Sequence, residues 1–206
     1  MLRPSNQIGR EQRANVLATQ LHVTVSEVNQ ILRRVTAESF PRHSNIDLVL
    51  NLAPSLPPIS VDEVKLERAF GELIENSVDF QPQGGQITIR TALADREFAR
   101  SLTGQQFPGE VIQVEFIDQG PGLTDQDRAR VFTPFYTRKA KGMGLGLSIV
   151  KGIIEAHGGA IREIGDLNAS KGRLQGAHFV VFLPVAEAPD ADRKEPHAAA
   201  SVPPKD

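Results

Sequence analysis

The sequence predicts a protein of the α/β class. In some stretches, apolar residues recur every three or four positions, as they do on the buried face of a helix. Shorter stretches lie between them, and in these the apolar residues alternate with polar ones, as they do in a strand. The chain has 206 residues, of which 40% are hydrophobic, and this is enough for one sizeable core. We therefore expect one main domain with an accessory segment at an end.

The first predicted element is helical and covers residues 9–39. Its apolar positions recur at threes and fours among charged residues, with a break near residues 22–27. They are Val16, Leu17, Leu21, Val25, Val28, Ile31, Leu32 and Val35. One face of this helix needs a packing partner.

A strand and a long helix come next. Residues 45–58 have the alternation of a half-buried strand and end in prolines. The alternating positions are Ile46, Leu48, Leu50 and Leu52. Ser60, with Glu63 three residues later, predicts the N-cap of a helix over residues 61–80.

Four more strands and a third helix complete the pattern. We expect strands near Ile87 and over 111–117, paired as neighbours and joined by a polar connection over 94–110. Two further strands fall within 160–165 and 177–185, the second apolar enough to lie centrally in a sheet. A helix begins near Leu147 and ends at Gly158, which favours the left-handed conformation. The polar tail, 187–206, is expected to be disordered.

Composition argues against several functions. Lys and Arg total 23 against 25 for Asp and Glu, so no broad basic field favours nucleic acid or an anionic membrane surface. The chain has no cysteine, which excludes disulfides and a thiol nucleophile and fits the cytoplasm. The five histidines lack metal-ligand spacing. No apolar run approaches the roughly 20 residues that span a bilayer, so we expect no membrane contact by this chain.

Residues 141–159, KGMGLGLSIVKGIIEAHGG, contain glycines at alternate positions before a predicted helix. Alternate glycines let backbone N–H groups approach a bulky anion, and the helix N-terminus adds the positive end of its dipole. Phosphate is the expected ligand. A dinucleotide fingerprint would need glycine at Leu147, and the dipeptide GK of a P-loop is absent. The stretch is also typical of a flexible loop before a core helix.

Two other motifs carry polar groups suited to a nucleotide. Asp118 ends an apolar strand and is followed by Gly120 and Gly122, so its carboxylate can accept the amino hydrogens of adenine, although Asp and Gly also make ordinary turns. Glu72 and Asn76 lie one helical turn apart and therefore share a face. Two oxygen donors at that spacing suit Mg²⁺, and they are equally typical of a solvated surface.

Four motifs in order resemble those of a known family. They are ELIENSVDF at 72–80, DQGPG at 118–122, FTPFYT at 132–137 and the stretch at 141–159. They resemble the asparagine box, first glycine box, phenylalanine box and second glycine box of the sensor histidine kinase ATP-binding domain. Its GHKL superfamily also includes DNA gyrase, MutL and the mitochondrial dehydrogenase kinases. The resemblance covers about residues 45–185.

The resemblance implies the Bergerat fold, a two-layer α/β sandwich in which a mixed sheet is covered on one face by three helices. It implies ATP and Mg²⁺ as cofactors, with Asn76 and Glu72 at the metal and Asp118 at adenine. Gly120 and Gly122 would shape the adenine floor, and Gly142, Gly144 and Gly146 would wrap the phosphates. Further ligand contacts implied by the resemblance are Asp79, Phe135, Tyr136, Arg138, Lys139, Lys141, Met143, Leu145 and Leu147. The segment from Phe132 to Lys141 resembles the mobile ATP lid of the family, and we call it the lid segment. Its cations Arg138, Lys139 and Lys141 can reach phosphate or remain solvated.

Glu72 departs from the histidine kinase pattern. Most histidine kinases have Asn or His there, whereas gyrase, MutL and the dehydrogenase kinases have a Glu that acts as a general base. The carboxylate favours water or a hydroxyl as acceptor, because a histidine nitrogen is already nucleophilic. The alternatives are therefore a gyrase-like or MutL-like ATPase switch, a kinase directed at hydroxyl groups, and a non-catalytic ATP-sensing scaffold.

A phosphoacceptor motif of the type His-Glu/Asp-x-x-x-Pro is absent from the sequence, since neither His22 nor His43 has these neighbours. The resemblance therefore implies that the phosphoacceptor histidine lies upstream in a longer protein or on another chain, and that a response regulator receives the phosphoryl group. We divide the chain into a helical segment at 1–40, the catalytic ATP-binding domain at 41–186 and the tail at 187–206. The helical segment resembles the end of a dimerisation helix and could form a weak homodimer through residues 9–39.

Overall fold

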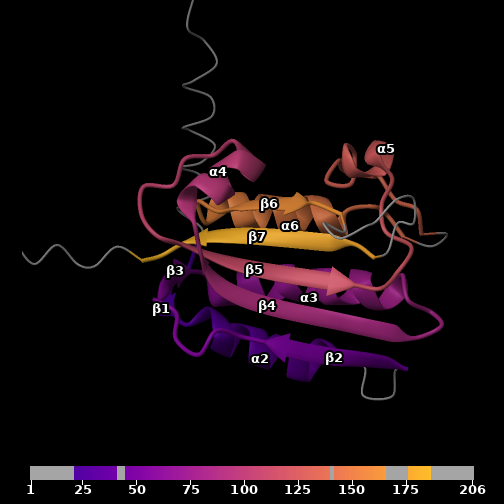
Figure 1. Cartoon of the computed structure of the whole chain (residues 1–206), viewed down its shortest axis with the longest axis horizontal. Coiled ribbons are helices and arrows are strands. Elements are labelled where there is room, and N and C mark those ends of the chain that lie inside the picture. The colour runs from indigo at the N-terminus through magenta and orange to yellow at the C-terminus, as the bar shows by residue number, and fades with distance from the viewer. Residues whose placement is uncertain (1–20, 41–44, 140–141, 166–175, 187–206) are drawn as a thin grey trace, which may run out of the picture.

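A computed structural model describes residues 21–40, 45–139, 142–165 and 176–186. Within these residues, five strands form one mixed sheet in the order β2-β4-β5-β7-β6 (Figure 1). The strands are β2 (Ile46–Asn51), β4 (Gly85–Ala94), β5 (Val111–Asp118), β7 (His178–Pro184) and β6 (Ala160–Glu163). β2 runs parallel to β4, and the other neighbours are antiparallel. The predicted pairing of the strands at Ile87 and 111–117 is confirmed as the β4–β5 ladder.

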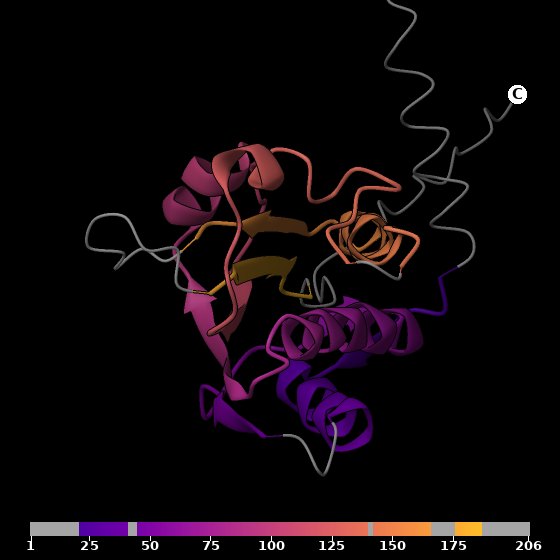
Figure 2. The ribbon, with the colours of Figure 1, turned by 90° about the vertical axis from the view of Figure 1, so that its right-hand side faces the viewer.

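Three helices cover one face of this sheet (Figure 2). They are α2 (Val28–Ser39), α3 (Glu63–Asp79) and α6 (Gly146–Ala156). The main hydrophobic core lies between these helices and the sheet, where the Phe70 ring of α3 packs on Phe116 of β5 with ring centroids 5.5 Å apart. The predicted two-layer α/β fold is confirmed. Gly158 has the predicted positive φ, 70°, directly after the α6 cap.

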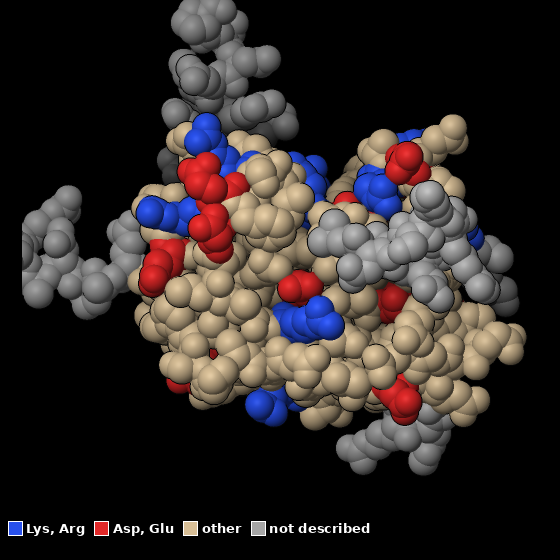
Figure 3. Space-filling model, viewed as in Figure 1, with Lys and Arg blue, Asp and Glu red and all other residues tan. Residues whose placement is uncertain are grey.

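The opposite face of the sheet carries a helix that the sequence analysis missed. α4 (Arg96–Thr103) lies within the segment predicted as a polar connection. Its N-cap Asp95 accepts a hydrogen bond from the Phe98 N–H, and Ala99 is buried against Phe182 and its neighbours in a second small core. The interpretation as a loop was wrong because only one short apolar face of α4 is buried. Figure 3 shows charges of both signs over α4 on this side of the molecule.

Residues 22–27 are also not helical. Thr24–Ser26 form strand β1, which pairs antiparallel with β3 (Ile59–Val61), and Thr24 lies opposite Val61. The break predicted near residues 22–27 is confirmed, although the strand that forms there was not predicted because its partner, β3, lies more than 30 residues along the chain. Ser60 is therefore inside a strand and does not cap α3. The cap is Asp62, whose carboxylate accepts from the Lys65 N–H.

Helix α2 packs into the same core as the sheet. Val28, Ile31, Leu32 and Val35 are all at most 3% exposed and lie in one cluster with α3. The Asn29 amide donates to the carbonyl of Ala53, which fixes α2 to the chain after β2. The expected boundary at residue 40 thus cuts through a shared core. The apolar stripe expected to hold a second copy is already buried inside this chain over 28–35.

Several expectations lie outside the described residues. They concern residues 9–20, the lid residue Lys141 and the tail at 187–206. A short helix, α5 (Asp125–Arg128), follows β5 and leads toward the lid segment. Among the described residues, no helix combines the length and apolar content needed to cross a membrane.

The shared core predicts that α2 contributes directly to stability. Leu32→Ala should lower the free energy of unfolding by about 2–5 kcal/mol, because the fully buried side chain leaves a cavity between α2 and α3. Arg33→Ala, at the neighbouring exposed position of α2, should change it by less than about 0.5 kcal/mol. Urea denaturation followed by circular dichroism measures both. Equal stability of the two variants would show that α2 is not part of the core.

Candidate nucleotide site

One cavity of about 540 Å³ lies between α3, the end of β5, the segment after α5 and the start of α6. α3 contributes Glu72, Asn76 and Asp79 to its wall, and β5 contributes Asp118. Most of its remaining lining residues come from the segments on either side of residues 140–141, which include Gly142 and Gly144. The helical spacing of α3 explains this wall, because residues four apart share a face while Leu66, Phe70 and Ile74 face the core.

Asp118 supplies a buried carboxylate at one end of the cavity. Asp118 lies two, four and six residues after Phe116, Val114 and Ile112, whose side chains are in the main core. Alternate residues of a strand share a face, so Asp118 faces the layer of α2, α3 and α6. Its Oδ1 accepts hydrogen bonds from the N–H groups of Gly120 (2.9 Å) and Ala177 (2.8 Å). Burial nevertheless raises the pKa of Asp118 above its ordinary value, because two amides only partly replace the lost water.

The Ser77 hydroxyl lies beside this carboxylate. The residue is 1% exposed, and its Oγ has no hydrogen-bond partner within ordinary geometry among the described residues. It is still near enough to favour the ionised form of Asp118 and so lower its pKa slightly against the effect of burial. An unpaired buried hydroxyl is costly, and a ligand or a water molecule can satisfy it. This end of the cavity therefore has a hydroxyl group with which a ligand can form a hydrogen bond.

The other end of the cavity is built from α3 and the first turn of α6. A Cβ added to Gly146 would lie 2.5 Å from the Glu72 Oε2, so the glycine lets the two helices approach closely. The N-terminus of α6 has no capping side-chain hydrogen bond and no acidic residue in its first turn. Its free N–H groups and helix dipole therefore favour an anion at this end.

The loop before α6 is held against the lid segment by Gly144. Its φ is 66°, and an added Cβ would lie 2.6 Å from the backbone carbon of Phe135. The Phe135 N–H donates to the Gly144 carbonyl at 2.8 Å, and Phe135 itself has a positive φ of 66°. Phe135 is 76% exposed and does not line the cavity. Glycine at 144 is thus needed for backbone geometry as well as for space.

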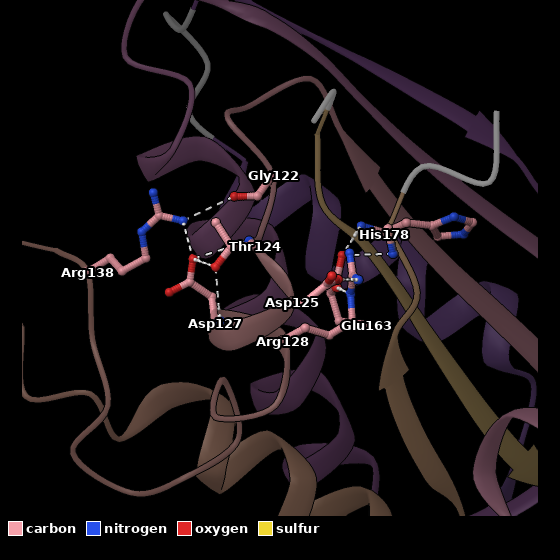
Figure 4. Close-up of polar contacts among 9 residues, drawn as sticks. Gly122, Thr124, Asp125, Asp127, Arg128, Arg138, Glu163 and His178 are labelled. Carbon is pink, nitrogen blue, oxygen red and sulfur yellow. Dashed lines mark hydrogen bonds and ion pairs between the residues drawn. The ribbon is translucent and has the colours of Figure 1, made fainter. Parts of the chain in front are cut away.

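Asp127 of α5 organises the lid segment (Figure 4). Its carboxylate accepts from the Tyr136 hydroxyl, from Thr124 and from Arg138 Nη1 at 3.0 Å, and Arg138 also donates to the Gly122 carbonyl. The Tyr136 and Thr124 hydroxyls lower the pKa of Asp127 to about 2. These contacts hold Arg138 against the chain that leaves β5.

A buried carboxylate attaches α5 to the sheet. The Glu163 side chain of β6 is fully buried and accepts from Arg128 Nε and from the N–H groups of Gly165 and His178 (Figure 4). Arg128 also pairs with Asp125. The base of the lid segment therefore has a fixed attachment.

Lys139 lines the cavity on the lid side. Its Nζ donates to the Asn76 Oδ1 at 2.7 Å and to the Asp79 Oδ2 at 2.6 Å. The ammonium also lies 5.6 Å from the ring centroid of Phe80. Asn76 therefore uses its amide oxygen to hold a cation of the chain itself.

The structure brings most of the predicted residues to one cavity. Those that line it are Glu72, Asn76, Asp79, Asp118, Gly122, Tyr136, Arg138, Lys139, Gly142, Met143, Gly144, Leu145, Gly146 and Leu147. Gly120 and Phe135 do not line it, and Lys141 lies outside the described residues. Sequence reasoning missed Arg68, Phe80, Pro121, Leu123, Val131, Thr137, Ile149, Ala177 and Phe179. The spacing of Arg68, four residues before Glu72, was a signal for it, whereas Ala177 and Phe179 reach the cavity only through strand pairing.

Residues 61–187 match the family described as histidine kinase-, DNA gyrase B- and HSP90-like ATPase. The match covers more than half of the chain and includes every predicted site residue. The protein belongs to this ATPase family.

Individual relatives are sensor histidine kinases. The chain is 29% identical over 167 residues to the sensory histidine kinase/phosphatase NtrB of Salmonella typhimurium, covering 80% of this chain and 44% of that protein. It is 36% identical over 142 residues to the alginate biosynthesis sensor protein KinB of Pseudomonas aeruginosa, covering 68% and 20%. The chain thus spans less than half the length of these curated relatives.

Solved structures agree with the fold. The mycobacterial sensor histidine kinase MprB has a TM-score of 0.62 at 26% identity, covering 80% of this chain and 97% of that one. Full-length ShkA in complex with AMPPNP has a TM-score of 0.65 at 26% identity, covering 87% and 38%. Both structures support the mixed sheet and its helix layer as a histidine kinase fold.

The burial of Asp118 predicts opposite effects of Asp118→Asn on binding and on stability. Because the folded-state pKa is raised, the ionised carboxylate opposes folding once the pH exceeds the pKa of the unfolded chain. Asn keeps an oxygen for the two amides and carries no charge, so the free energy of unfolding at pH 7 should stay equal or rise by up to about 1 kcal/mol. ATP affinity should fall about tenfold or more, because the acceptor facing the cavity is lost.

Calorimetric titration and thermal unfolding measure these two effects. Asp47→Asn on the exposed part of β2 is the control and should change neither quantity. A large loss of stability together with unchanged ATP affinity would show that Asp118 is a structural residue.

The geometry of Gly144 predicts a strong effect of Gly144→Ala. A side chain at a φ of 66° would meet the backbone of the lid segment, so the variant should lose about 1–3 kcal/mol of stability and bind nucleotide weakly. Gly152→Ala is the matched control, since a Cβ on this α6 residue would meet nothing within 4 Å. It should be neutral or stabilising by up to about 1 kcal/mol. The same calorimetric and thermal measurements compare both variants.

Proposed function

We propose that this chain is the ATP-binding catalytic domain of a two-component sensor histidine kinase. It transfers the γ-phosphoryl group of Mg-ATP to a histidine on a separate acceptor domain or on an upstream segment. The observation that carries the proposal is the single cavity that has the Asp118 carboxylate at one end and the Asn76–Gly146 region at the other. Such a cavity offers separate environments for a base and for a triphosphate.

The polar groups at each end suit the two parts of ATP. At one end, the free oxygen of Asp118 can accept from the exocyclic amino group of adenine, and the unpaired Ser77 hydroxyl can satisfy a ring nitrogen or a bridging water. Leu123 and Phe179 supply apolar wall around the base. At the other end, the uncapped N–H groups of α6 can receive phosphate oxygens. The AMPPNP in the related ShkA structure has both chemical parts.

The donor set near α3 fits a magnesium ion. Asn76 offers an amide oxygen and Glu72 a carboxylate, and Mg²⁺ takes one or two protein oxygens while keeping several waters. The described residues contain no cluster of three or more metal-binding side chains, which is compatible with such a sparse site. When bound, Mg²⁺ would supply neutralisation of phosphate charge.

Catalysis in this proposal is mainly positioning. The α6 N-terminus orients the γ-phosphate, and the close contact of Gly146 with Glu72 places a carboxylate at the same end of the cavity. The nucleophile is the histidine of the acceptor domain, and a response regulator receives the phosphoryl group from it. Use of ATP as substrate favours the cytoplasm as the location of this domain.

The direct test is phosphoryl transfer to a phosphoacceptor domain supplied in trans. With labelled ATP, the parent chain should yield acid-labile, base-stable label on the acceptor, and Asn76→Ala should lower the rate at least about a hundredfold through loss of the metal ligand. ATP binding in calorimetry without phosphoryl transfer or phosphate release would favour the alternative of a non-catalytic ATP-sensing scaffold. Label stable to acid would indicate a hydroxyl acceptor.

Glu72 favours a second candidate, an ATPase switch in which this carboxylate activates water. Under this alternative, Glu72→Gln should abolish phosphate release while ATP affinity stays within about twofold, because the amide keeps the size of the side chain but cannot accept a proton. Glu75→Gln is the matched control, since Glu75 is exposed on the same helix and does not line the cavity. A malachite green assay of phosphate release measures turnover. Unchanged turnover in Glu72→Gln would remove the ATPase candidate.

A further inference from the structure

The ammonium of Lys139 is hydrogen-bonded to the oxygen atom that the proposed function assigns to the metal as a ligand. Asn76 has one amide oxygen, Oδ1, and Lys139 Nζ donates to it at 2.7 Å. The same ammonium pairs with the Asp79 carboxylate at 2.6 Å. Asn76 and Asp79 lie three residues apart on α3, so the two oxygens face the lid lysine together. Mg²⁺ and this ammonium compete for Oδ1, because two cations at one oxygen atom repel each other.

We propose that Asp79 and Asn76 hold Lys139 in a latch that closes the cavity of the nucleotide-free protein, and that Mg-nucleotide must displace the ammonium to bind. The inference rests on the proposed function for the identity of the ligand. It assigns Asp79 a role as a positioning residue that acts through Lys139. The sequence resemblance had placed Asp79 among residues that contact the nucleotide.

The charge of Asp79 supports this assignment. A carboxylate near the phosphate end of the cavity repels a triphosphate unless a cation neutralises it. Lys139 is the partner of Asp79 among the described residues, whereas Arg138, the other lid cation that the structure describes, is held by Asp127 and the Gly122 carbonyl. These two cations thus have different hydrogen-bond partners, and only the partners of Lys139 include the proposed metal ligand.

The strength of the contacts suits a latch that opens. The side chains of Lys139 and Asp79 are 25% and 56% exposed, and an ion pair with this exposure is weakly stabilising because water screens it. The hydrogen bond to Asn76 and the Phe80 ring add to it. Such a contact can be displaced by a divalent ion that arrives with several phosphate oxygens.

The first experiment measures the latch without any nucleotide. Hydrogen exchange of the amides of residues 135–139 reports closure, because the Phe135 and Lys139 N–H groups are hydrogen-bonded within this region. Lys139→Met should raise the exchange rate about three- to tenfold, and Asp79→Asn should raise it by less, because the bond of Lys139 to Asn76 remains. The double variant should match Lys139→Met, since the Asp79 contact is already lost when the ammonium is absent. Lys151→Met, which removes an exposed ion pair on α6, should leave the rate unchanged.

The second experiment measures displacement by stopped-flow binding of a fluorescent ATP analogue with Mg²⁺. Loss of a cation would by itself slow association with an anionic ligand, whereas loss of a latch speeds it because the open form becomes more populated. We therefore expect Lys139→Met to raise the association rate about three- to tenfold. A slower or unchanged rate overturns the displacement, and unchanged exchange in both single variants, or additive effects in the double variant, overturns the latch.

If the proposed ATP-binding function is wrong, the two experiments give a different combination of results. A protein that binds no nucleotide would show no stopped-flow signal in the parent or in any variant, and this would contradict both the ATP site and displacement by nucleotide. The exchange experiment would still decide whether Asp79 and Lys139 form a latch, because it contains no nucleotide.

Discussion

The packing of α3 on the sheet is the constraint on which the rest of the site depends. Leu66, Phe70, Leu73 and Ile74 of this helix are fully buried, and Phe70 contacts Phe116 on the central strand β5. Each such side chain contributes roughly 1.5–3 kcal/mol by leaving water, so the rotation of α3 about its axis is fixed. Once the apolar stripe faces the sheet, the polar stripe with Glu72 and Asn76 must face the gap between α3 and α6.

The same packing explains why Asp118 is buried. The alternation of β5 points Phe116 into the core, and the carboxylate two residues later has to point the same way. Two amides and a nearby hydroxyl only partly offset its desolvation. A fold under selection for stability alone would place an apolar residue there, because an unpaired charge in such a position opposes folding. Asp118 is therefore the residue at which stability and ligand recognition conflict most clearly.

The lid segment is attached differently at its two sides. At the α5 side, the buried Glu163–Arg128 contact and the Asp127 cluster fix it to the sheet and to the turn after β5. At the cavity side, it touches α3 through the ion pair of Lys139 with Asp79, whose carboxylate is more exposed than those of Glu163 and Asp127. This difference follows from burial, because the same kind of ion pair is stronger where water is excluded. A segment with a firm base and a weak tip can move at the tip while the base stays in place.

The sequence by itself determined the α/β class, the central elements and the residues that meet at the cavity, because strand and helix periods and the spacing of Glu72, Asn76 and the glycines are local properties of the chain. It did not determine that Thr24–Ser26 form a strand, that α2 shares the core, or that Asp62 caps α3. These features depend on β3, α3 and other partners distant along the chain. Tertiary structure also decided which cation reaches Asn76, since Lys139 lies 63 residues away and only folding brings its ammonium to that oxygen.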